Sequence, residues 1–262
     1  MAIDLNADIG EGIGGDPEAL DAALLDVVTS VNVACGGHAG NNESMSRVCP
    51  LAAERGVAIG AHISYPDREG FGRLPMDINN DELFESLFQQ LQDLQTKAVA
   101  AGTAVTYIKP HGYLYTAPAG IDGHASAVID VIKQYARETG KLLPVLGLPG
   151  SPLLEAAAEQ GVKGVPEAFA DRAYTTQGTL VPRGEPGAVV TDPNDALTRL
   201  KRLIRDDEIV SIDGTPIEVR ARSICVHGDT PGAAIIARRL RAAIDADRVR
   251  ITPFAPPPNK AA

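Results

Sequence analysis

Short runs of apolar residues alternate along the chain with longer segments in which apolar residues recur at helical spacing. The runs predict buried strands near residues 2–8, 30–36, 57–62, 105–111, 142–148, 164–170 and 223–228. The segments between them predict helices near 17–28, 45–56, 81–102 and 151–161, and the last three end in glycine. Strands that alternate with helices indicate βαβ units and a parallel sheet.

Polar residues stand at the ends of at least six of these seven runs, and four of the five histidines are placed in this way. The residues are Asp8 with Glu11, His38, His62, Lys109 with His111, Asp171 with Arg172, and His227 with Asp229. An open sheet gathers its ligands at one switch point, whereas a barrel brings many strand ends to one mouth. The pattern therefore predicts an α/β fold, a seven-stranded (β/α) barrel that is distorted relative to the eight-stranded TIM barrel.

The alternation of strand and helix patterns also predicts the domain organisation. No linker divides the chain, so residues 1–262 are expected to form a single barrel domain. Near 208–220, Asp213-Gly214 lies between two β-prone runs, which predicts an inserted hairpin with a two-residue turn. The proline-rich end, near 254–262, is expected to be a disordered tail.

Composition narrows the classes of function. A net charge of −10 argues against nucleic acid as a partner. No apolar stretch is long enough to suggest a membrane span, and the first residues lack the pattern of a signal peptide. The three scattered cysteines are typical of reduced thiols. These features favour a soluble cytoplasmic protein; a homo-oligomer is left open.

The segment GEGIGG (10–15) matches the dinucleotide-binding pattern G-x-G-x-x-G between a strand and a helix. The strand before it carries three polar residues, however, and the second strand lacks an acidic residue for a ribose hydroxyl. The sequence therefore argues against a nicotinamide cofactor. It also contains no P-loop pattern, so nothing in it indicates that this chain binds ATP by itself.

Each candidate residue also has a purely structural interpretation. Asp4, Asn6 and Asp8 alternate along the first strand and share its inner face, where they could form a buried network or a site. Asp8, nearest the strand end, is the stronger functional candidate. Lys109 on an inner face requires an acidic partner or an anionic ligand. Arg172 could bind a carboxylate or form a surface ion pair.

The remaining candidates are weaker. Cys35 and Cys225 lie inside apolar runs and are interpreted as buried thiols. Tyr65, Asp67 and Arg73 belong to a glycine-rich loop that could close over the mouth. His124 follows a predicted loop and receives no role.

Six segments together resemble a known family: DLNADIGEG, VTSVNVACGGHAGN, GVAIGAHISYPDREGFGR, IKPHGYLY, EAFADRAY and ICVHGDTP. They are similar, in order and spacing, to the LamB/YcsF family between about residues 4 and 240. The resemblance implies a barrel of the glycoside hydrolase/deacetylase type. It also implies one component of an ATP-dependent 5-oxoprolinase, which opens 5-oxo-L-proline to L-glutamate together with subunits B and C. The family's common form is ACGFHAG, whereas Gly37 stands at the phenylalanine position here.

On this interpretation the catalytic residues are Asp8, His38, His62, Lys109, His111 and His227. The substrate-binding residues are Asn6, Glu11, Arg172 and Asp229. ATP would be handled with the partner subunits. One alternative is a metal-dependent, deacetylase-like amide or ester hydrolase, in which Asp8, His62 and His111 hold a divalent ion. A second alternative is a non-catalytic substrate-binding subunit.

Overall fold

Seven parallel strands form a closed barrel in the computed structural model, which describes residues 2–116 and 124–258. Each strand pairs with the next one along the chain, and β9 closes the ring by pairing with both β6 and β1. The barrel strands are β1 (Ala2–Ile9), β2 (Ser30–Ala34), β3 (Ala58–His62), β4 (Val105–Ile108), β5 (Val145–Gly147), β6 (Gly164–Phe169) and β9 (Ser223–Val226). The predicted seven-stranded barrel is confirmed.

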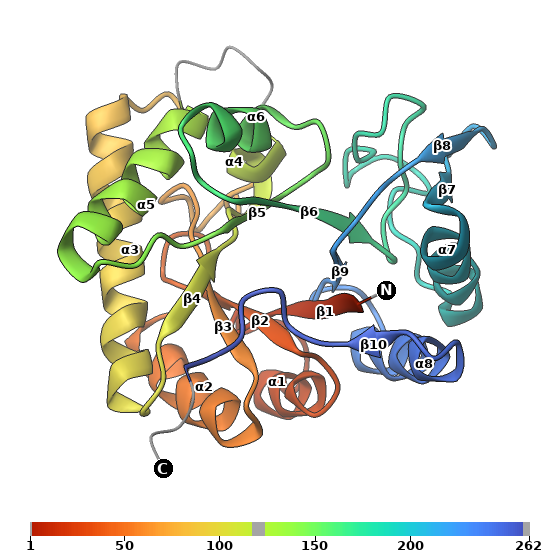
Figure 1. Cartoon of the computed structure of the whole chain (residues 1–262), viewed down its shortest axis with the longest axis horizontal. Coiled ribbons are helices and arrows are strands. Elements are labelled where there is room, and N and C mark those ends of the chain that lie inside the picture. The colour runs from red at the N-terminus through yellow and green to blue at the C-terminus, as the bar shows by residue number, and fades with distance from the viewer. Residues whose placement is uncertain (1, 117–123, 259–262) are drawn as a thin grey trace.

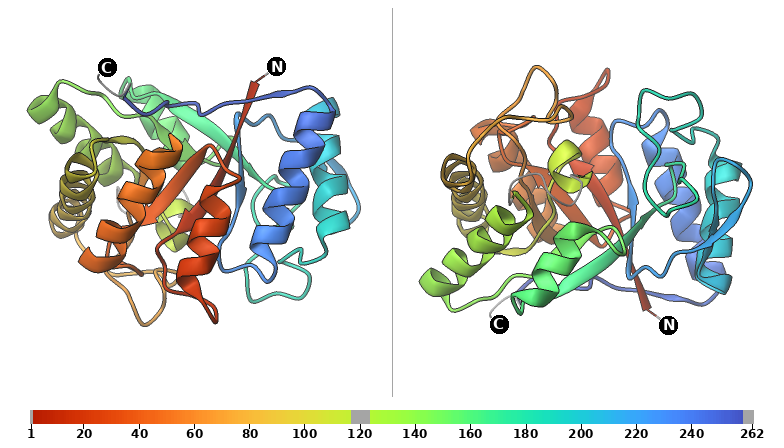
Figure 2. Two further views of the ribbon diagram at one scale, coloured as in Figure 1. Left: turned by 90° about the horizontal axis from the view of Figure 1, so that it is seen from below. Right: turned by 90° about the horizontal axis from the view of Figure 1, so that it is seen from above.

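Helices surround the barrel, as Figures 1 and 2 show from three directions. Those in the described part of the chain are α1 (Pro17–Leu25), α2 (Asn42–Arg55), α3 (Asn80–Ala100), α4 (Gly112–Thr116), α5 (His124–Thr139), α6 (Pro152–Glu159), α7 (Pro193–Asp206) and α8 (Ala233–Ala246). Among them there is none with the length and apolarity that crossing a bilayer requires. Local sequence sets their ends: α2 begins with a capping box between Asn41 and Ser44 and ends at Gly56, whose φ is 66°.

The alternation along β1 separates the two faces of the barrel wall. Ile3 and Leu5 belong to the large apolar core, whereas Asp4, Asn6 and Asp8 are buried polar residues on the opposite face. Parallel pairing with β2 sets Asn6 beside Ser30 and Asp8 beside Asn32. The inner face of the wall therefore carries layers of polar residues at defined depths.

The amino-terminal end of the barrel is closed by apolar side chains. A Cβ on Gly60 would overlap the ring of Tyr107, so the glycine leaves room for this tyrosine on the neighbouring strand. Phe254 packs against Tyr107 with ring centroids 4.8 Å apart, and Ala255 is buried beside it. The tail prediction therefore starts too early, because these two apolar residues close the barrel. Residues 259–262 lie outside the described residues.

A two-stranded antiparallel sheet, β7 (Glu208–Val210) and β8 (Pro216–Glu218), precedes the last barrel strand. Its turn is longer than the two residues predicted, because the N–H of Ser211 donates to the carbonyl of Thr215 and Gly214 has a φ of 83°. These features match a three-residue loop with a left-handed glycine. A short strand, β10 (Arg250–Ile251), pairs with the first residues of β1.

Candidate active site at the barrel mouth

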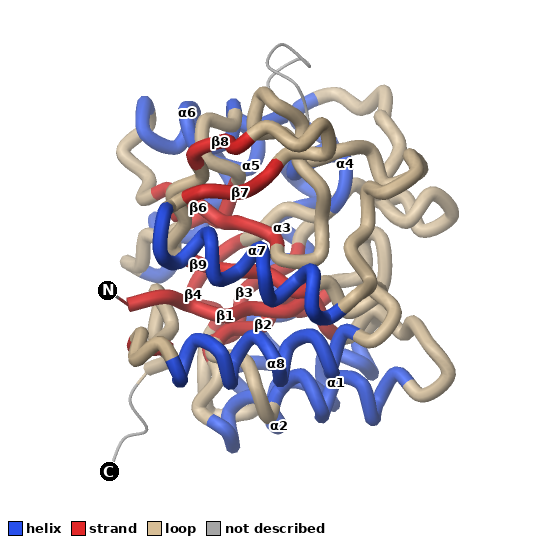
Figure 3. The backbone as a smooth tube through the Cα atoms, turned by 90° about the vertical axis from the view of Figure 1, so that its right-hand side faces the viewer, coloured by secondary structure: helices blue, strands red, loops and turns tan. Residues whose placement is uncertain are grey.

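The barrel mouth lies at the carboxyl ends of the strands, where loops gather away from the N-terminus (Figure 3). Asp8 lies near the end of β1, His62 ends β3, and Lys109 and His227 come directly after β4 and β9. Glu11, His38 and His111 belong to the loops that follow β1, β2 and β4. The structure brings together at this mouth Asp8, Glu11, His38, His62, Lys109, His111 and His227. The positions agree with the sequence analysis, and the roles of these residues stay predictions.

Three histidines and one glutamate form a compact group, here called the histidine cluster (Glu11, His38, His62, His111). The rings of His38 and His111 stack with centroids 3.6 Å apart and an interplanar angle of 6°. His62 meets His111 edge-on, with its Nε2 3.0 Å from His111 Nδ1. Glu11 Oε1 lies 3.2 Å from His38 Nε2 and 3.8 Å from His111 Nδ1. Four strand ends thus deliver one side chain each to the cluster.

The surroundings of the cluster disfavour charge on Glu11, His38 and His111. Burial, followed by the charge of His62, holds the pKa of His38 well below its usual range. Burial, followed by the charge of the neighbouring His38, also holds the pKa of His111 well below its usual range. Burial, followed by the charge of Asp8, raises the pKa of Glu11 well above its ordinary value. His38 and His111 are therefore neutral near pH 7.

Lys109 lies at the centre of a buried ion-pair network. Its Nζ is 3.2 Å from Asp8 Oδ1, 3.1 Å from Glu167 Oε1 and 3.1 Å from Cys225 Sγ. Burial works to lower the pKa of Lys109, but the charge of Asp8 and the other two groups outweighs it and raises this pKa. Burial works to raise the pKa of Asp8, but Lys109 and then His62 hold it well below its usual range. Asp8 is thus an ionised carboxylate.

Beneath this network lies a lower polar layer (Asp4, Asn6, Asn32, Glu167, Ser223). Asn6 Nδ2 donates to Glu167 Oε1 at 2.8 Å and to Ser223 Oγ at 2.7 Å, while its Oδ1 accepts from Asn32 at 2.7 Å. Asn32 also donates to Asp8, which links the two layers. The side chain of Asn6 is therefore fully used by its neighbours. Its predicted role in substrate binding gains no contact from this structure.

A cavity of about 810 Å³ opens at the mouth, a volume suited to a small-molecule ligand. Six of the sequence-predicted residues line it: Asp8, His62, Lys109, His111, Arg172 and His227. The other predicted site residues lie outside its lining: Asn6, Glu11, His38 and Asp229. Among these, Glu11 and His38 contact the lining residues through the histidine cluster. The cavity floor therefore combines a carboxylate, an ammonium group and imidazoles.

Asp171 holds His227 in place at the edge of the cavity. His227 Nδ1 lies 3.0 Å from Asp171 Oδ1, and the backbone N–H of His227 donates to Asp171 Oδ2 at 3.0 Å. Thr230 Oγ1 donates to the same oxygen at 2.6 Å. Burial works to raise the pKa of Asp171, but His227 and these hydrogen bonds lower it. An ionised Asp171 thus leaves Nε2 of His227 as the nitrogen free for chemistry.

The arginines at the rim have different partners. Arg73 and Arg183 both pair with the carboxylate of Asp229, the latter at 2.9 Å. Arg172, in contrast, donates to the backbone carbonyls of Val181 at 2.6 Å and Ala188 at 3.3 Å, and burial lowers its pKa to about 10. The guanidinium group of Arg172 therefore holds its own loop, although it lines the cavity.

The loop between β3 and α3 covers the histidine cluster. Phe71 has a φ of 54°, and its carbonyl accepts a hydrogen bond from His111 Nε2 at 2.9 Å. Asp67 accepts from the N–H of Gly70 within the loop, and Arg73 reaches the rim. Tyr65 is fully buried and bonds to His124. Strained backbone of this kind is typical of functional sites.

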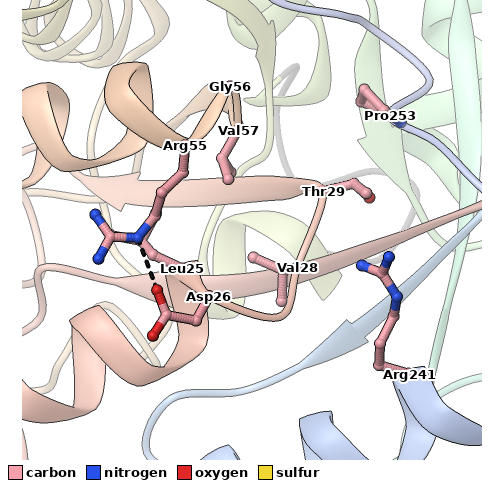
Figure 4. A pocket seen from close by; sticks show the side chains of 9 residues that line it. All are labelled: Leu25, Asp26, Val28, Thr29, Arg55, Gly56, Val57, Arg241 and Pro253. Atoms are coloured by element: carbon pink, nitrogen blue, oxygen red, sulfur yellow. Dashed lines mark hydrogen bonds and ion pairs between the residues drawn. The ribbon is translucent and has the colours of Figure 1, made fainter.

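A smaller cavity of about 380 Å³ lies near the amino-terminal end of the barrel (Figure 4). It carries two arginines, but both have protein partners. Arg55 Nε donates to Asp26 at 2.8 Å, and Arg241 donates to the carbonyl of Val27 at 2.9 Å. This cavity lies at the opposite end from the polar residues described above, and we assign it no chemistry.

The LamB/YcsF family model matches residues 3–258. The chain belongs to the LamB/YcsF family. Over 253 residues it is 54% identical to a Streptomyces coelicolor protein named as the A subunit of 5-oxoprolinase, covering 97% of this chain and 100% of that protein. A solved structure, the lactam utilization protein from Thermus thermophilus, superposes with a TM-score of 0.86 at 35% identity, covering 97% of this chain and all of that one.

A more distant likeness concerns the fold alone. The Xyl-CE4 domain of a multidomain xylanase, from the hindgut metagenome of Trinervitermes trinervoides, superposes with a TM-score of 0.51 at 10% identity. The match covers 96% of this chain and 86% of that domain. The LamB/YcsF barrel therefore shares its architecture with an enzyme domain of different sequence.

Within this LamB/YcsF chain, Gly37 has a packing reason. A Cβ at this position would overlap the hydroxyl of Ser64 and come within 2.8 Å of the amide oxygen of Gln90. Gln90, from α3, bonds the backbone of Ser64 through both its amide atoms. Ser64 Oγ in turn lies 3.0 Å from His38 Nδ1. The space beside His38 is thus filled by a glutamine reaching in from a helix.

Sequence reasoning missed several residues of the site. Glu167 was the one acidic residue in a predicted apolar strand, and this isolated charge could have identified it. Ser64 and Gln90 carried no such signal, because their roles depend on a helix packing behind the strand ends. Arg183 lies in a loop without periodicity. Contacts between distant segments decide these positions.

Proposed function

We propose that this protein is component A of an ATP-dependent 5-oxoprolinase, which hydrolyses 5-oxo-L-proline to L-glutamate together with subunits B and C. The observation that carries the proposal is the 54% identity, over essentially the full length of both chains, to a protein named as the A subunit of 5-oxoprolinase. The mouth cavity supports it, because it joins a rim of arginines to a floor of ionised and proton-transferring groups.

The rim is suited to the carboxylate of the substrate. Arg73 and Arg183 line the cavity and converge on Asp229, a carboxylate of the chain itself. A substrate carboxylate entering the cavity takes the place of Asp229 beside at least one guanidinium group. Charge-assisted hydrogen bonds of this kind contribute about 1.5–3 kcal/mol each. We assign substrate recognition to these two arginines, which Asp229 holds in position before the substrate enters.

The floor is suited to opening the lactam ring. Hydrolysis adds water across the C–N bond: the hydroxyl group goes to the carbonyl carbon and the proton goes to the ring nitrogen. Asp8, ionised and buried beside the cavity, acts as the general base for water. Lys109 stabilises the negative charge that develops on the carbonyl oxygen. His227, oriented by Asp171, delivers a proton to the leaving nitrogen.

Coupling to ATP explains the need for partner subunits. An unstrained amide is a poor electrophile, and glutamate recloses readily, so transfer of a phosphoryl group from ATP to the lactam oxygen, with release of ADP, favours opening. Water then attacks the activated carbon and displaces the ring nitrogen, and a second water releases phosphate from the acyl group. The sequence has no P-loop, and we propose that nucleotide handling involves subunits B and C. The three cysteines are free and buried, in keeping with a cytoplasmic location, where ATP is available. The net charge of −10 disfavours nucleic acid as a further partner.

Reconstitution tests this proposal. The purified chain alone is expected to form little or no glutamate from 5-oxoproline and ATP, and the chain with subunits B and C is expected to form glutamate and ADP. Arg183→Ala in the complex raises KM about 10- to 100-fold, the equivalent of one charged hydrogen bond. Arg220→Ala, at an exposed ion pair on the hairpin, is the matched control and leaves KM unchanged. Absence of glutamate formation by the complete complex rejects the function, and full turnover by the single chain rejects the division of labour.

A further inference from the structure

The hydrogen-bond partners of the histidine cluster fix which ring nitrogens carry protons. His62 Nδ1 lies 3.0 Å from the backbone carbonyl of Lys109, and His111 Nε2 lies 2.9 Å from that of Phe71. A carbonyl oxygen can only accept a hydrogen bond, so both of these nitrogens must be donors. In a neutral imidazole the other nitrogen then carries a lone pair. His62 Nε2 and His111 Nδ1 are these other nitrogens.

The position of the proton on His38 follows from the hydrogen bonds of Ser64. Its Nδ1 lies 3.0 Å from Ser64 Oγ, and the single hydroxyl proton of Ser64 is donated to the carbonyl of Tyr65 at 3.0 Å. Ser64 therefore accepts from His38, which puts the proton on Nδ1 and the lone pair on Nε2. That nitrogen faces the carboxyl oxygen of Glu11 at 3.2 Å.

The cluster thus directs three nitrogen lone pairs and one carboxyl oxygen towards one another. His62 Nε2 and His111 Nδ1 face each other at 3.0 Å, which is a hydrogen-bond distance with no hydrogen between two neutral rings. Lone pairs held this close need a metal ion or an added proton among them.

We propose that Glu11, His38, His62 and His111 form a binding site for a divalent transition-metal ion of the zinc class. Their ligand atoms all lie within 4.8 Å of one another, and the contacts given above span 3.0 to 3.8 Å. Ligands at ~2.0–2.1 Å from a tetrahedral zinc ion are about 3.3 Å apart, so the donor set is close to the required spacing. Imidazole nitrogens with one carboxylate suit zinc and its neighbours rather than magnesium or calcium.

The surrounding contacts resemble those that support metal sites. Metal-binding histidines usually donate their second ring N–H to a carbonyl, carboxylate or other acceptor, and all three histidines here do so. A divalent ion at this place supplies a Lewis acid beside the cavity floor. The proposal concerns binding and does not depend on the reaction proposed above.

A second group of potential ligands, Asp8, Cys225 and His227, is less suited to an ion. Asp8 is already neutralised by Lys109, and His227 is bonded to Asp171. Burial raises the pKa of the Cys225 thiol well above its ordinary value, whereas a metal requires the thiolate. Asp8 lies 3.6 Å from His62 Nε2, so it stands next to the proposed site as a base and not within it.

Metal binding by the full chain tests the proposal. Protein treated with a chelator is titrated with Zn²⁺ by calorimetry and with Co²⁺ by visible absorption, which reports coordination directly. The wild type is expected to bind one ion per chain. Glu11→Gln and His38→Gln are expected to weaken binding by at least about 100-fold, since even loss of a supporting contact costs ~10- to 100-fold. His124→Gln is the matched control, because His124 is equally buried but, within residues 2–116 and 124–258, bonds only to Tyr65 and a carbonyl.

The outcomes are distinguishable. A folded wild type that takes up no stoichiometric ion overturns the proposal. Wild-type affinity in both folded variants also overturns it, as does loss of binding in Cys225→Ala. Circular dichroism checks each variant, and Glu11→Gln, which changes a loop residue, serves if a histidine variant does not fold. An ion bound as expected in a complex without 5-oxoprolinase activity rejects only the proposed function.

Discussion

Asp4 and Asp8 lie four residues apart on β1, share its inner face and are both buried, yet their surroundings differ in kind. Burial raises the pKa of Asp4 to about 6. The hydroxyl groups of Ser223, Ser30 and Thr29, which donate hydrogen bonds to Asp4, work to lower this pKa but do not outweigh burial. Burial acts on Asp8 in the same direction, but Lys109 outweighs it and holds the pKa of Asp8 well below its ordinary value. One carboxyl group has neutral donors around it, and the other has a cation.

The two residues represent two layers of the barrel interior. The lower layer is a closed network in which hydroxyl and amide groups satisfy one another, and its members lie outside the lining of the cavity. The upper layer faces the cavity and, in the metal site proposed above, carries nitrogen lone pairs that face one another. Polarity inside a barrel therefore does not by itself mark a site; a polar group that faces a cavity and lacks a partner does.

Lys109 connects the layers, and its loss gives the largest expected effect on stability. Lys109→Met leaves Asp8 and Glu167 buried without their cation. Breaking a buried pair in this way typically costs about 3–5 kcal/mol. Urea denaturation measures the change, with Lys201→Met, an exposed lysine on α7, as the control. A change below about 1 kcal/mol, as for a surface pair, would mean that the network is not electrostatically coupled.

Asp4, in the lower layer, is expected to make the free energy of unfolding depend on pH. Because its pKa rises from 3.8 unfolded to about 6 folded, the folded protein binds more protons between these values, and stability falls as pH rises through this window. At about 1.4 kcal/mol per pKa unit, the total is on the order of 3 kcal/mol. The difference in unfolding free energy between wild type and Asp4→Asn is therefore expected to change between pH 4 and 7 and to level off above it. A difference independent of pH would contradict the raised pKa.

A substitution that disturbs the packing beside the upper layer is expected to lower stability by a smaller amount. Gly37→Ala pushes against Ser64 and Gln90 and weakens the contact that fixes the His38 ring. Overpacking of this kind costs about 1–3 kcal/mol. Gly15→Ala is the control, since a Cβ there meets nothing within 4 Å. Equal stability of the two variants, measured by thermal unfolding, would show that the Gln90 side chain moves aside at no cost.

The sequence was informative about faces and strand ends but not about depth. The period of two along β1 correctly grouped Asp4, Asn6 and Asp8, because alternation fixes which face a strand residue occupies. How far down the barrel the cavity reaches depends on what fills the interior, and Tyr107 and Glu167 fill it below Asp8. The alternation along β1 could not show that Asn6, predicted to bind substrate, lies in the closed layer.

Loops and helices behind the strand ends were the least predictable part. Arg172 was predicted to bind the substrate carboxylate or to form a surface ion pair. Its guanidinium group donates to two backbone carbonyls of its own loop, and its role in substrate binding stays a prediction. No local pattern marked Arg183, which pairs with Asp229. The start of the predicted tail packs on Tyr107, because Phe254 and Ala255 are apolar and become buried there. Such contacts join segments that are distant in sequence, and no local pattern records them.

The most direct test of the two-layer account compares Asp8→Asn with Asp4→Asn. Asparagine keeps the shape of the side chain, and Lys109 keeps Glu167 as its partner when Asp8 is changed. Asp8→Asn is expected to keep a melting temperature near that of wild type and to lower 5-oxoproline hydrolysis by the reconstituted complex by ~10²- to 10⁴-fold, as for loss of a general base. Asp4→Asn is expected to change the stability and to leave turnover per folded molecule nearly intact. A destabilised but fully active Asp8→Asn enzyme would contradict the account and assign Asp8 to the structural network.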